Sequence, residues 1–348
     1  MQRLFLLFAL LVCGMSAPAS AADPTPAVIA HRGASGERPE HTLEAYALAI
    51  EQGADWVEPD LVITRDGVLV ARHENEISET TDVATRPEFA NRRTTKVIEG
   101  KSVVGWFAED FTLAELKTLR ARERLPQLRP ASAAHDGKFQ IATLDEIAAL
   151  VRDHRGEAGR PIGIVAELKH AAYFDSIGLP LDRPLLAALD GPLGQDRALV
   201  IVESFEPGIL RRLNRTTDVR LVQLLAEEGG PADSKELSFR AMATPEGLAR
   251  IRGYADGIGA AKGLIIPRAP GGVSLPPTTL VEDAKHAGLF VFVWTFRSEN
   301  QFLPTELRRG EDPAARGDAA GEYRMFYKLG VDGVFSDFPA QAVAARGD

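Results

Sequence analysis

Short apolar runs alternate with helix-patterned segments along most of this 348-residue chain. Three times a helical pattern ends in a small-residue turn that closes on aspartate and leads into the next apolar run: Gly53-Ala54-Asp55, Tyr254-Ala255-Asp256 and Gly330-Val331-Asp332. Alternation of this kind is typical of a parallel sheet covered by helices, and the repeated turn favours a (β/α)8 barrel. Periodicity alone leaves an open, doubly wound sheet as the alternative.

The expected strands are short and spread over the chain. They cover residues 27–31, 56–63, 68–73, 162–168, 198–204, 220–225, 257–259 with its flanks, 290–295 and 331–336. Between the first two, Thr42 is the predicted N-cap of a helix that Gly53 ends.

Residues 74 to about 140 break this rhythm, because they are polar, lack a sustained period and contain several prolines and glycines. Long excursions in compact domains are usually functional, so we expect an insertion that covers the substrate at the barrel mouth. The alternative is a solvated decoration that touches no ligand.

Residues 1–22 have the pattern of a signal peptide. Arg3 precedes an apolar run over residues 4–12, and Ala19-Ser20-Ala21-Ala22 offers a small-residue cleavage site. The run is too short for a permanent membrane span. The single cysteine, Cys13, lies in this leader after Val12, which is too large for a lipoprotein signal. The mature chain would therefore contain no cysteine and no disulfide.

The composition is that of an ordinary globular protein, with 45% hydrophobic residues and a net charge of −9. The acidic balance argues against a nucleic-acid partner. The length of residues 23–348 suits one large α/β domain with an insertion at about 74–140. No later stretch is long and apolar enough to insert stably into a membrane.

Polar side chains follow the first two expected strands. Val28 to Ala30 lead directly into His31-Arg32-Gly33, and parallel α/β folds carry their chemistry at such strand ends. In the next strand Glu58 and Asp60 stand two residues apart, so a strand's period points both carboxylates the same way. Adjacent acids repel each other unless a cation lies between them, which favours a hard divalent metal.

Several spaced motifs together resemble the glycerophosphodiester phosphodiesterase family. They are His31-Arg32-Gly33, Pro39-Glu40-His41-Thr42, Gly53-Ala54-Asp55-Trp56-Val57-Glu58-Pro59-Asp60-Leu61, Val70-Ala71-Arg72-His73, Ala166-Glu167-Leu168-Lys169, Gln223-Leu224, Tyr254-Ala255-Asp256-Gly257-Ile258-Gly259 and Gly333-Val334-Phe335-Ser336-Asp337-Phe338-Pro339. The resemblance is strongest over residues 28–83 and is closest to the secreted, periplasmic type. It implies a closed TIM barrel that hydrolyses glycerophosphodiesters to sn-glycerol 3-phosphate and an alcohol in the periplasm.

The resemblance also implies a metal site of Glu58, Asp60 and Glu167. An all-oxygen set without cysteine or paired histidines favours Ca²⁺ or Mg²⁺ over Zn²⁺. The likeness to the periplasmic branch favours Ca²⁺, with Mg²⁺ as the alternative.

The proton carriers implied by the resemblance are His31 and His73, because imidazole titrates near neutrality. We assign His31 as the base and His73 as the acid. Arg32 and Lys169 are expected to hold the phosphate. The family usually has aspartate after the second histidine; here Glu74 follows, and a longer acid can still orient the ring.

Four further residues have open roles. Glu203 either contacts the glycerol hydroxyls or a metal-bound water, or is a rim residue. Trp294 and Phe296 either wall the pocket or fill the core. His41 is expected to fix the loop ahead of the first helix rather than touch substrate.

Two other functions remain open from the sequence. One is a phospholipase-like enzyme on intact lipid, against which the acidic balance and 7% aromatic content argue. The other is an envelope protein that binds phosphodiesters or polymers without turnover, which would not need two histidines. The sequence does not predict the oligomeric state or the head-group preference.

Overall fold

The computed structural model describes residues 25–347 of the chain, apart from the side chains of 155–158. The predicted signal peptide lies outside the described residues. Within them, no helix combines the length and apolar character needed to cross a bilayer.

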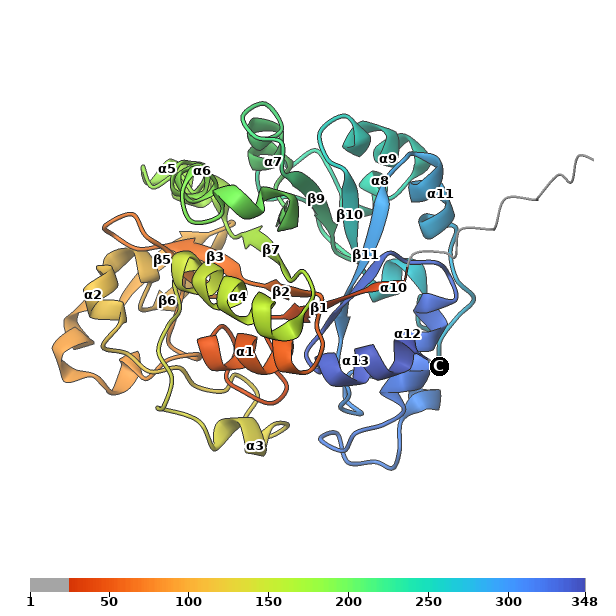
Figure 1. The fold of residues 1–348 in the computed structure, drawn as a ribbon, viewed down its shortest axis with the longest axis horizontal. Coiled ribbons are helices and arrows are strands. Elements are labelled where there is room, and N and C mark those ends of the chain that lie inside the picture. The colour runs from red at the N-terminus through yellow and green to blue at the C-terminus, as the bar shows by residue number, and fades with distance from the viewer. Residues whose placement is uncertain (1–24, 348) are drawn as a thin grey trace, which may run out of the picture.

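The core of the described chain is a closed barrel of parallel strands (Figure 1). Its eight strands are β1 (Ala27–His31), β2 (Trp56–Glu58), β7 (Gly163–Leu168), β8 (Val200–Ser204), β9 (Arg220–Leu225), β10 (Gly257–Ala261), β11 (Phe290–Phe296) and β12 (Gly333–Ser336). The sheet closes because β1 pairs with β12 and β2, while β2 pairs with β7. The (β/α)8 prediction is confirmed, and an open sheet is excluded.

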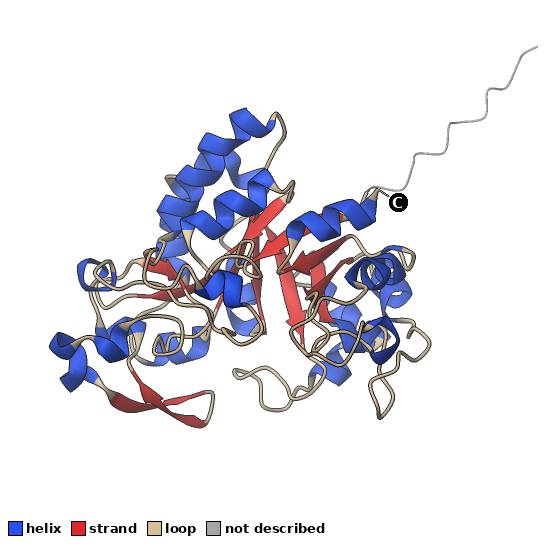
Figure 2. Cartoon of the chain, turned by 90° about the horizontal axis from the view of Figure 1, so that it is seen from below, coloured by secondary structure: helices blue, strands red, loops and turns tan. Residues whose placement is uncertain are grey.

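Helices surround the barrel (Figure 2). They are α1 (Leu43–Glu51), α4 (Leu144–Ala158), α5 (Ala171–Ser176), α6 (Asp182–Asp190), α7 (Pro207–Leu213), α8 (Phe239–Met242), α9 (Pro245–Arg252), α10 (Lys262–Ile265), α11 (Leu280–His286), α12 (Ala319–Tyr327) and α13 (Pro339–Arg346). Thr42 caps α1 by accepting a hydrogen bond from the amide of Ala45 at 3.2 Å, as predicted. The chain leaves this helix through Gly53, whose φ of +91° favours glycine.

The barrel interior packs large side chains against glycines on neighbouring strands. Gly163 faces the ring of Trp56, where an added Cβ would come within 2.0 Å of a ring carbon. Gly257 faces Phe290 in the same way, at 2.4 Å. The glycines therefore make room for aromatic rings that fill the lower barrel.

The three aspartates of the repeated turns tie each turn to a neighbouring strand. Each side chain accepts a hydrogen bond from a backbone amide near the start of that strand. The pairs are Asp55 with Val28 (2.8 Å), Asp256 with Leu221 (3.0 Å) and Asp332 with Val291 (2.7 Å). The repeated sequence pattern is thus a repeated device that satisfies strand amides at the bottom of the barrel.

The expected second strand is broken at Pro59, and β3 (Asp60–Ile63) follows β2. The expected strand over 68–73 is shorter, at β4 (Leu69–Ala71), and runs antiparallel to β3 outside the closed barrel. The connection between β3 and β4 is too short for the crossover that a parallel pair requires.

Most of the insertion after β4 lies to one side of the barrel, at the left of Figure 1, and its last part lies at the bottom of the view, below α1. It contains a hairpin of β5 (Thr94–Ile98) and β6 (Lys101–Gly105) and two short helices, α2 (Leu113–Leu116) and α3 (Pro130–Ala133). Short 3-10 turns cover residues 83–85, 87–92 and 108–110 here, and 194–199 and 305–307 elsewhere.

Candidate active site

A cavity of about 530 Å³ opens at the carboxyl ends of the barrel strands. Its size is that of a site for a small ligand. Its lining includes seven of the predicted site residues together: His31, Arg32, Glu58, His73, Glu167, Lys169 and Glu203. Trp294 lines it as well.

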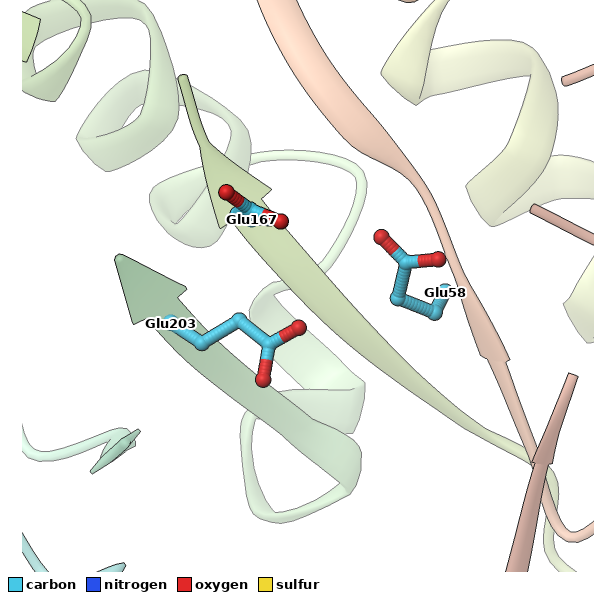
Figure 3. A group of neighbouring side chains, drawn as sticks. All are labelled: Glu58, Glu167 and Glu203. Atoms are coloured by element: carbon cyan, nitrogen blue, oxygen red, sulfur yellow. The ribbon is translucent and has the colours of Figure 1, made fainter. Parts of the chain in front are cut away.

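Three buried glutamates meet at one edge of this cavity. Glu58 ends β2, while Glu167 and Glu203 lie near the ends of β7 and β8 (Figure 3). One carboxylate oxygen of each lies within 4.8 Å of the others, and no residue of the three is more than 7% exposed. Among the described residues, Oε1 of Glu58 and Oε2 of Glu203 have no hydrogen-bond partner.

The charges of this cluster are not balanced by protein groups alone. Burial raises the pKa of Glu167 to about 8, and burial with the neighbouring carboxylates raises the pKa of Glu58 and of Glu203 well above the usual range. Buried carboxylate oxygens that repel one another and lack protein partners are donors that a divalent cation binds and neutralises. The oxygen donors therefore fit a hard divalent ion such as Ca²⁺ or Mg²⁺.

Asp60 is the predicted ligand that lies outside this group of three. Its Oδ2 accepts a hydrogen bond from Nε2 of His41 at 2.8 Å and lies 3.1 Å from Nε of Arg32. Burial raises the pKa of Asp60, but Lys169, His73, Arg32 and the hydrogen bond from His41 together hold it well below its usual range. Asp60 thus anchors cationic side chains, and its part in metal binding stays a prediction.

His31 is held by a carboxylate that sequence reasoning did not single out. Its Nδ1 lies 2.6 Å from Oδ1 of Asp337, the residue that follows β12. Burial, with the nearby charge of Arg32, lowers the pKa of His31 to about 4. The available signal was a carboxylate directly after a barrel strand, the position from which the other site residues were inferred.

His73 is oriented by Glu74, as the sequence allowed. Its Nδ1 contacts Oε1 of that glutamate. Burial, with the charges of Arg32 and Lys169, lowers the pKa of His73 to about 3. Each ring therefore meets a carboxylate at Nδ1, which assigns the ring proton to Nδ1 and the lone pair to Nε2.

Two arginines of the insertion hold the carboxylates behind the histidines. Arg124 bridges Glu74 and Glu40, each at 2.7 Å. Arg129 bridges Asp337 at 2.5 Å and Glu299 at 2.7 Å. No described residue that lines the cavity belongs to 74–140, and the insertion supports the site through these two arginines. That the insertion covers a bound substrate stays a prediction. The carboxylates that Arg124 and Arg129 contact are distant from them in sequence, so no local pattern identifies these ion pairs.

The two predicted phosphate-binding residues lie beside the acid cluster. Nζ of Lys169 is 2.8 Å from Oε1 of Glu167, and NH1 of Arg32 donates to Oε2 of Glu40 at 3.1 Å. The backbone amide of Arg32 also donates to the side chain of Glu58 at 2.8 Å. The side chains of Arg32 and Lys169 therefore line the cavity and lie beside the glutamate cluster.

The structure answers the open aromatic assignments. Trp294 walls the cavity, packing edge-on against Phe205, while Phe296 is buried in the core against Tyr323. His41 is fully buried between Tyr46 and Asp60 and does not line the cavity, as expected for a residue that fixes structure.

The model of the glycerophosphoryl diester phosphodiesterase family matches residues 31–341. The chain belongs to this family. A glycerophosphodiester phosphodiesterase of Arabidopsis thaliana is 33% identical over 326 residues, covering 90% of this chain and 84% of the relative. One of Haemophilus influenzae is 28% identical over 349 residues, covering 91% and 88%. As a glycerophosphodiester phosphodiesterase by family, the chain is an enzyme.

Solved structures share the fold. An Oleispira antarctica phosphodiesterase, in complex with the product sn-glycerol-3-phosphate, has a TM-score of 0.59 at 23% identity. The alignment covers 93% of this chain and 98% of that one. The likeness extends over nearly the whole glycerophosphodiester phosphodiesterase barrel.

Proposed function

We propose that this enzyme hydrolyses glycerophosphodiesters, the deacylated head groups of phospholipids, to sn-glycerol 3-phosphate and a free alcohol with the help of a divalent cation. One observation carries the proposal: both histidines, the phosphate-binding cations and the glutamate cluster line a single cavity. Its family and the product bound by the Oleispira antarctica phosphodiesterase support the substrate class.

Glu58, Glu167 and Glu203 would hold the cation. When bound, such an ion neutralises charge on a phosphate and orients it. The all-oxygen donors suit Ca²⁺ and Mg²⁺ alike. We propose Ca²⁺, because the proposed periplasmic location offers it and the sequence resembles the periplasmic branch of the family, with Mg²⁺ as the alternative. Metal dependence itself is part of the proposal.

Arg32 and Lys169 neutralise the remaining phosphate charge, and their charge-assisted hydrogen bonds fix the phosphorus between the two imidazoles. Asp337 and Glu74 hold Nδ1 of each ring, so Nε2 of His31 and of His73 is available to the reacting oxygens. We assign His31 to take the proton of the attacking oxygen and His73 to protonate the departing alkoxide.

The pKa values of His31 and His73 indicate which protonation state has to change when substrate binds. With pKa values of about 4 and 3, both histidines are neutral at pH 7 in the free protein. A neutral His31 is ready to act as a base. His73 acts as an acid only once it carries a proton, which the negative charge of a bound phosphodiester favours by raising the pKa of a nearby imidazole.

The test is release of glycerol 3-phosphate from glycerophosphocholine, with and without chelator. Chelation should remove activity, and added Ca²⁺ should restore it. His31→Ala should lower kcat by at least about 100-fold, since general acid–base catalysis typically contributes that much. His286→Ala, at an exposed position on α11, is the matched control and should retain full activity. Turnover that survives both chelator and His31→Ala contradicts the mechanism, and no turnover at all would favour a binding protein.

We also propose that residues 1–22 direct this enzyme to the periplasm, where Ca²⁺ is available. The basic, apolar and small-residue pattern of the segment supports this. Amino-terminal sequencing of the protein from a periplasmic fraction should begin at Ala22 or Asp23. Recovery of the intact chain from the cytoplasm would contradict it.

A further inference from the structure

The wall of the cavity opposite the glutamate cluster carries three cationic side chains. Lys262 and Arg268 follow β10, and Arg297 follows β11; all three line the cavity. The proposed reaction uses none of them directly, since only Arg297 touches a catalytic group, through Asp337. Because the glutamates and these cations line one cavity, the cavity has room beside this wall for one substituent of a diester that reacts at the cluster.

One carboxylate serves two of these cations. Nζ of Lys262 lies 2.8 and 2.9 Å from the two oxygens of Glu322, and NH2 of Arg268 lies 3.1 Å from one of them. Glu322 is only 2% exposed. Lys262, Arg268 and Glu322 together therefore carry a net positive charge beside the cavity.

Both arginines present unused donors there. Nε of Arg297 donates to Asp337 at 2.9 Å, but NH1 and NH2 have no acceptor among the described residues. NH2 of Arg268 donates to the carbonyl of Phe302 and to Glu322, while its Nε and NH1 have no such acceptor. The side chains are 32% (Arg268) and 27% (Arg297) exposed, so these donors are accessible. Guanidinium forks of this kind bind carboxylates and phosphates.

The acids near this wall do not use up its charge. Asp337 already accepts from Arg129 and His31 as well as from Arg297. Glu227, the acid that lines this side, is exposed and lies against the amide of Gly263 at 3.2 Å.

We infer that Lys262, Arg268 and Arg297 form a subsite for an anionic group on the leaving alcohol, a carboxylate or a second phosphate. The enzyme then favours glycerophosphodiesters whose head group carries an extra negative charge. This inference rests on the proposed function and adds its substrate preference.

The competing occupant is a quaternary ammonium head group held by aromatic rings. Arg297 already lies over the ring of Phe302, 4.7 Å from its centroid, and Phe205 packs edge-on against Trp294. A cationic head group placed there would also meet three positive charges. The arrangement therefore favours the anion.

Glycerophosphoserine and glycerophosphoethanolamine test this directly, because they differ by one carboxylate. Wild type should hydrolyse the serine ester with a kcat/KM about tenfold higher, the effect of one charge-assisted hydrogen bond. Arg268→Gln should bring the ratio of the two kcat/KM values close to one, and Arg268→Lys should leave it between one and the wild-type value. Raised salt should lower the ratio of the wild type. Arg250→Gln, at an exposed position on α9, is the control and should keep the wild-type ratio.

Equal hydrolysis of the two esters by wild type, or a preference for glycerophosphocholine, would overturn the subsite and leave the proposed function intact. Arg268→Gln with an unchanged ratio would overturn it too. Failure of wild type to hydrolyse any of the three esters would reject the proposed function and the inference with it. A thermal melt of each variant separates loss of the ratio from loss of the fold.

Discussion

Without the proposed cation, the stability of this protein should fall as pH rises, and Glu167 should account for much of the fall. Its folded-state pKa is about 8, against an ordinary 4.5. A raised folded-state pKa means that the contribution to stability is complete below pH 4.5 and is lost as pH rises towards 8. Each pH unit in that window costs about 1.4 kcal/mol, so the loss at pH 7 is about 3 kcal/mol.

The measurement is the Tm of chelated wild type and of Glu167→Gln at pH 5 and pH 7. For a chain of this size, about 3 kcal/mol corresponds to a Tm difference of about 4 °C. Glutamine is neutral at both pH values, so the variant should lack this component. It also loses the contact with Lys169, but at both pH values alike. Glu311→Gln, an exposed position, should behave as wild type.

Other groups titrate in the same window but do not mask the comparison. The lowered pKa values of His31 and His73 stabilise the fold above pH 6.5, and that stability is lost as pH falls towards 4 and 3. The two histidines act in both proteins, so their contribution cancels in the difference between the two pH profiles. That difference reports Glu167 together with its repulsion of Glu58 and Glu203, whose pKa values Glu167 helps to raise. Parallel Tm changes in wild type and Glu167→Gln under chelation would refute the reasoning. Excess Ca²⁺ should stabilise wild type, by about 2.7 kcal/mol at 100 times its Kd, and the variant much less.

Three further outcomes are expected. Asp337→Asn should lower kcat by at least about 100-fold with little change in KM, because the ring of His31 loses the acceptor that sets its tautomer; an unchanged kcat would remove Asp337 from the mechanism. Arg124→Gln should lower kcat about tenfold, because Glu74 loses its anchor beside His73, and a change confined to KM would contradict a positioning role. Gly257→Ala should lower the free energy of unfolding by about 1–3 kcal/mol in a denaturant titration, because the added methyl group meets the ring of Phe290, and an unchanged midpoint would show that the ring moves freely.

Local pattern was enough to predict much of this molecule. Alternating strand and helix patterns predicted the barrel, and the resemblance to the family selected a closed sheet. Because the carboxyl ends of parallel strands meet at one edge, His31, Glu58 and Glu167 could be placed together before any coordinates. The turn aspartates were likewise visible as a repeat, although their hydrogen bonds to neighbouring strands were not.

Tertiary structure decided how those residues are supported. Asp60 and Glu203 both lie close to strand ends, yet Glu203 joins the glutamate cluster while Asp60 pairs with His41 and Arg32. Arg129 reaches Asp337 across 208 positions of sequence, and Arg124 reaches Glu40 across 84. Periodicity reports the direction of a side chain relative to its own element, whereas these ion pairs depend on how distant segments pack. The sequence alone therefore determined the barrel and the edge that carries the chemistry, and packing determined which charges meet there.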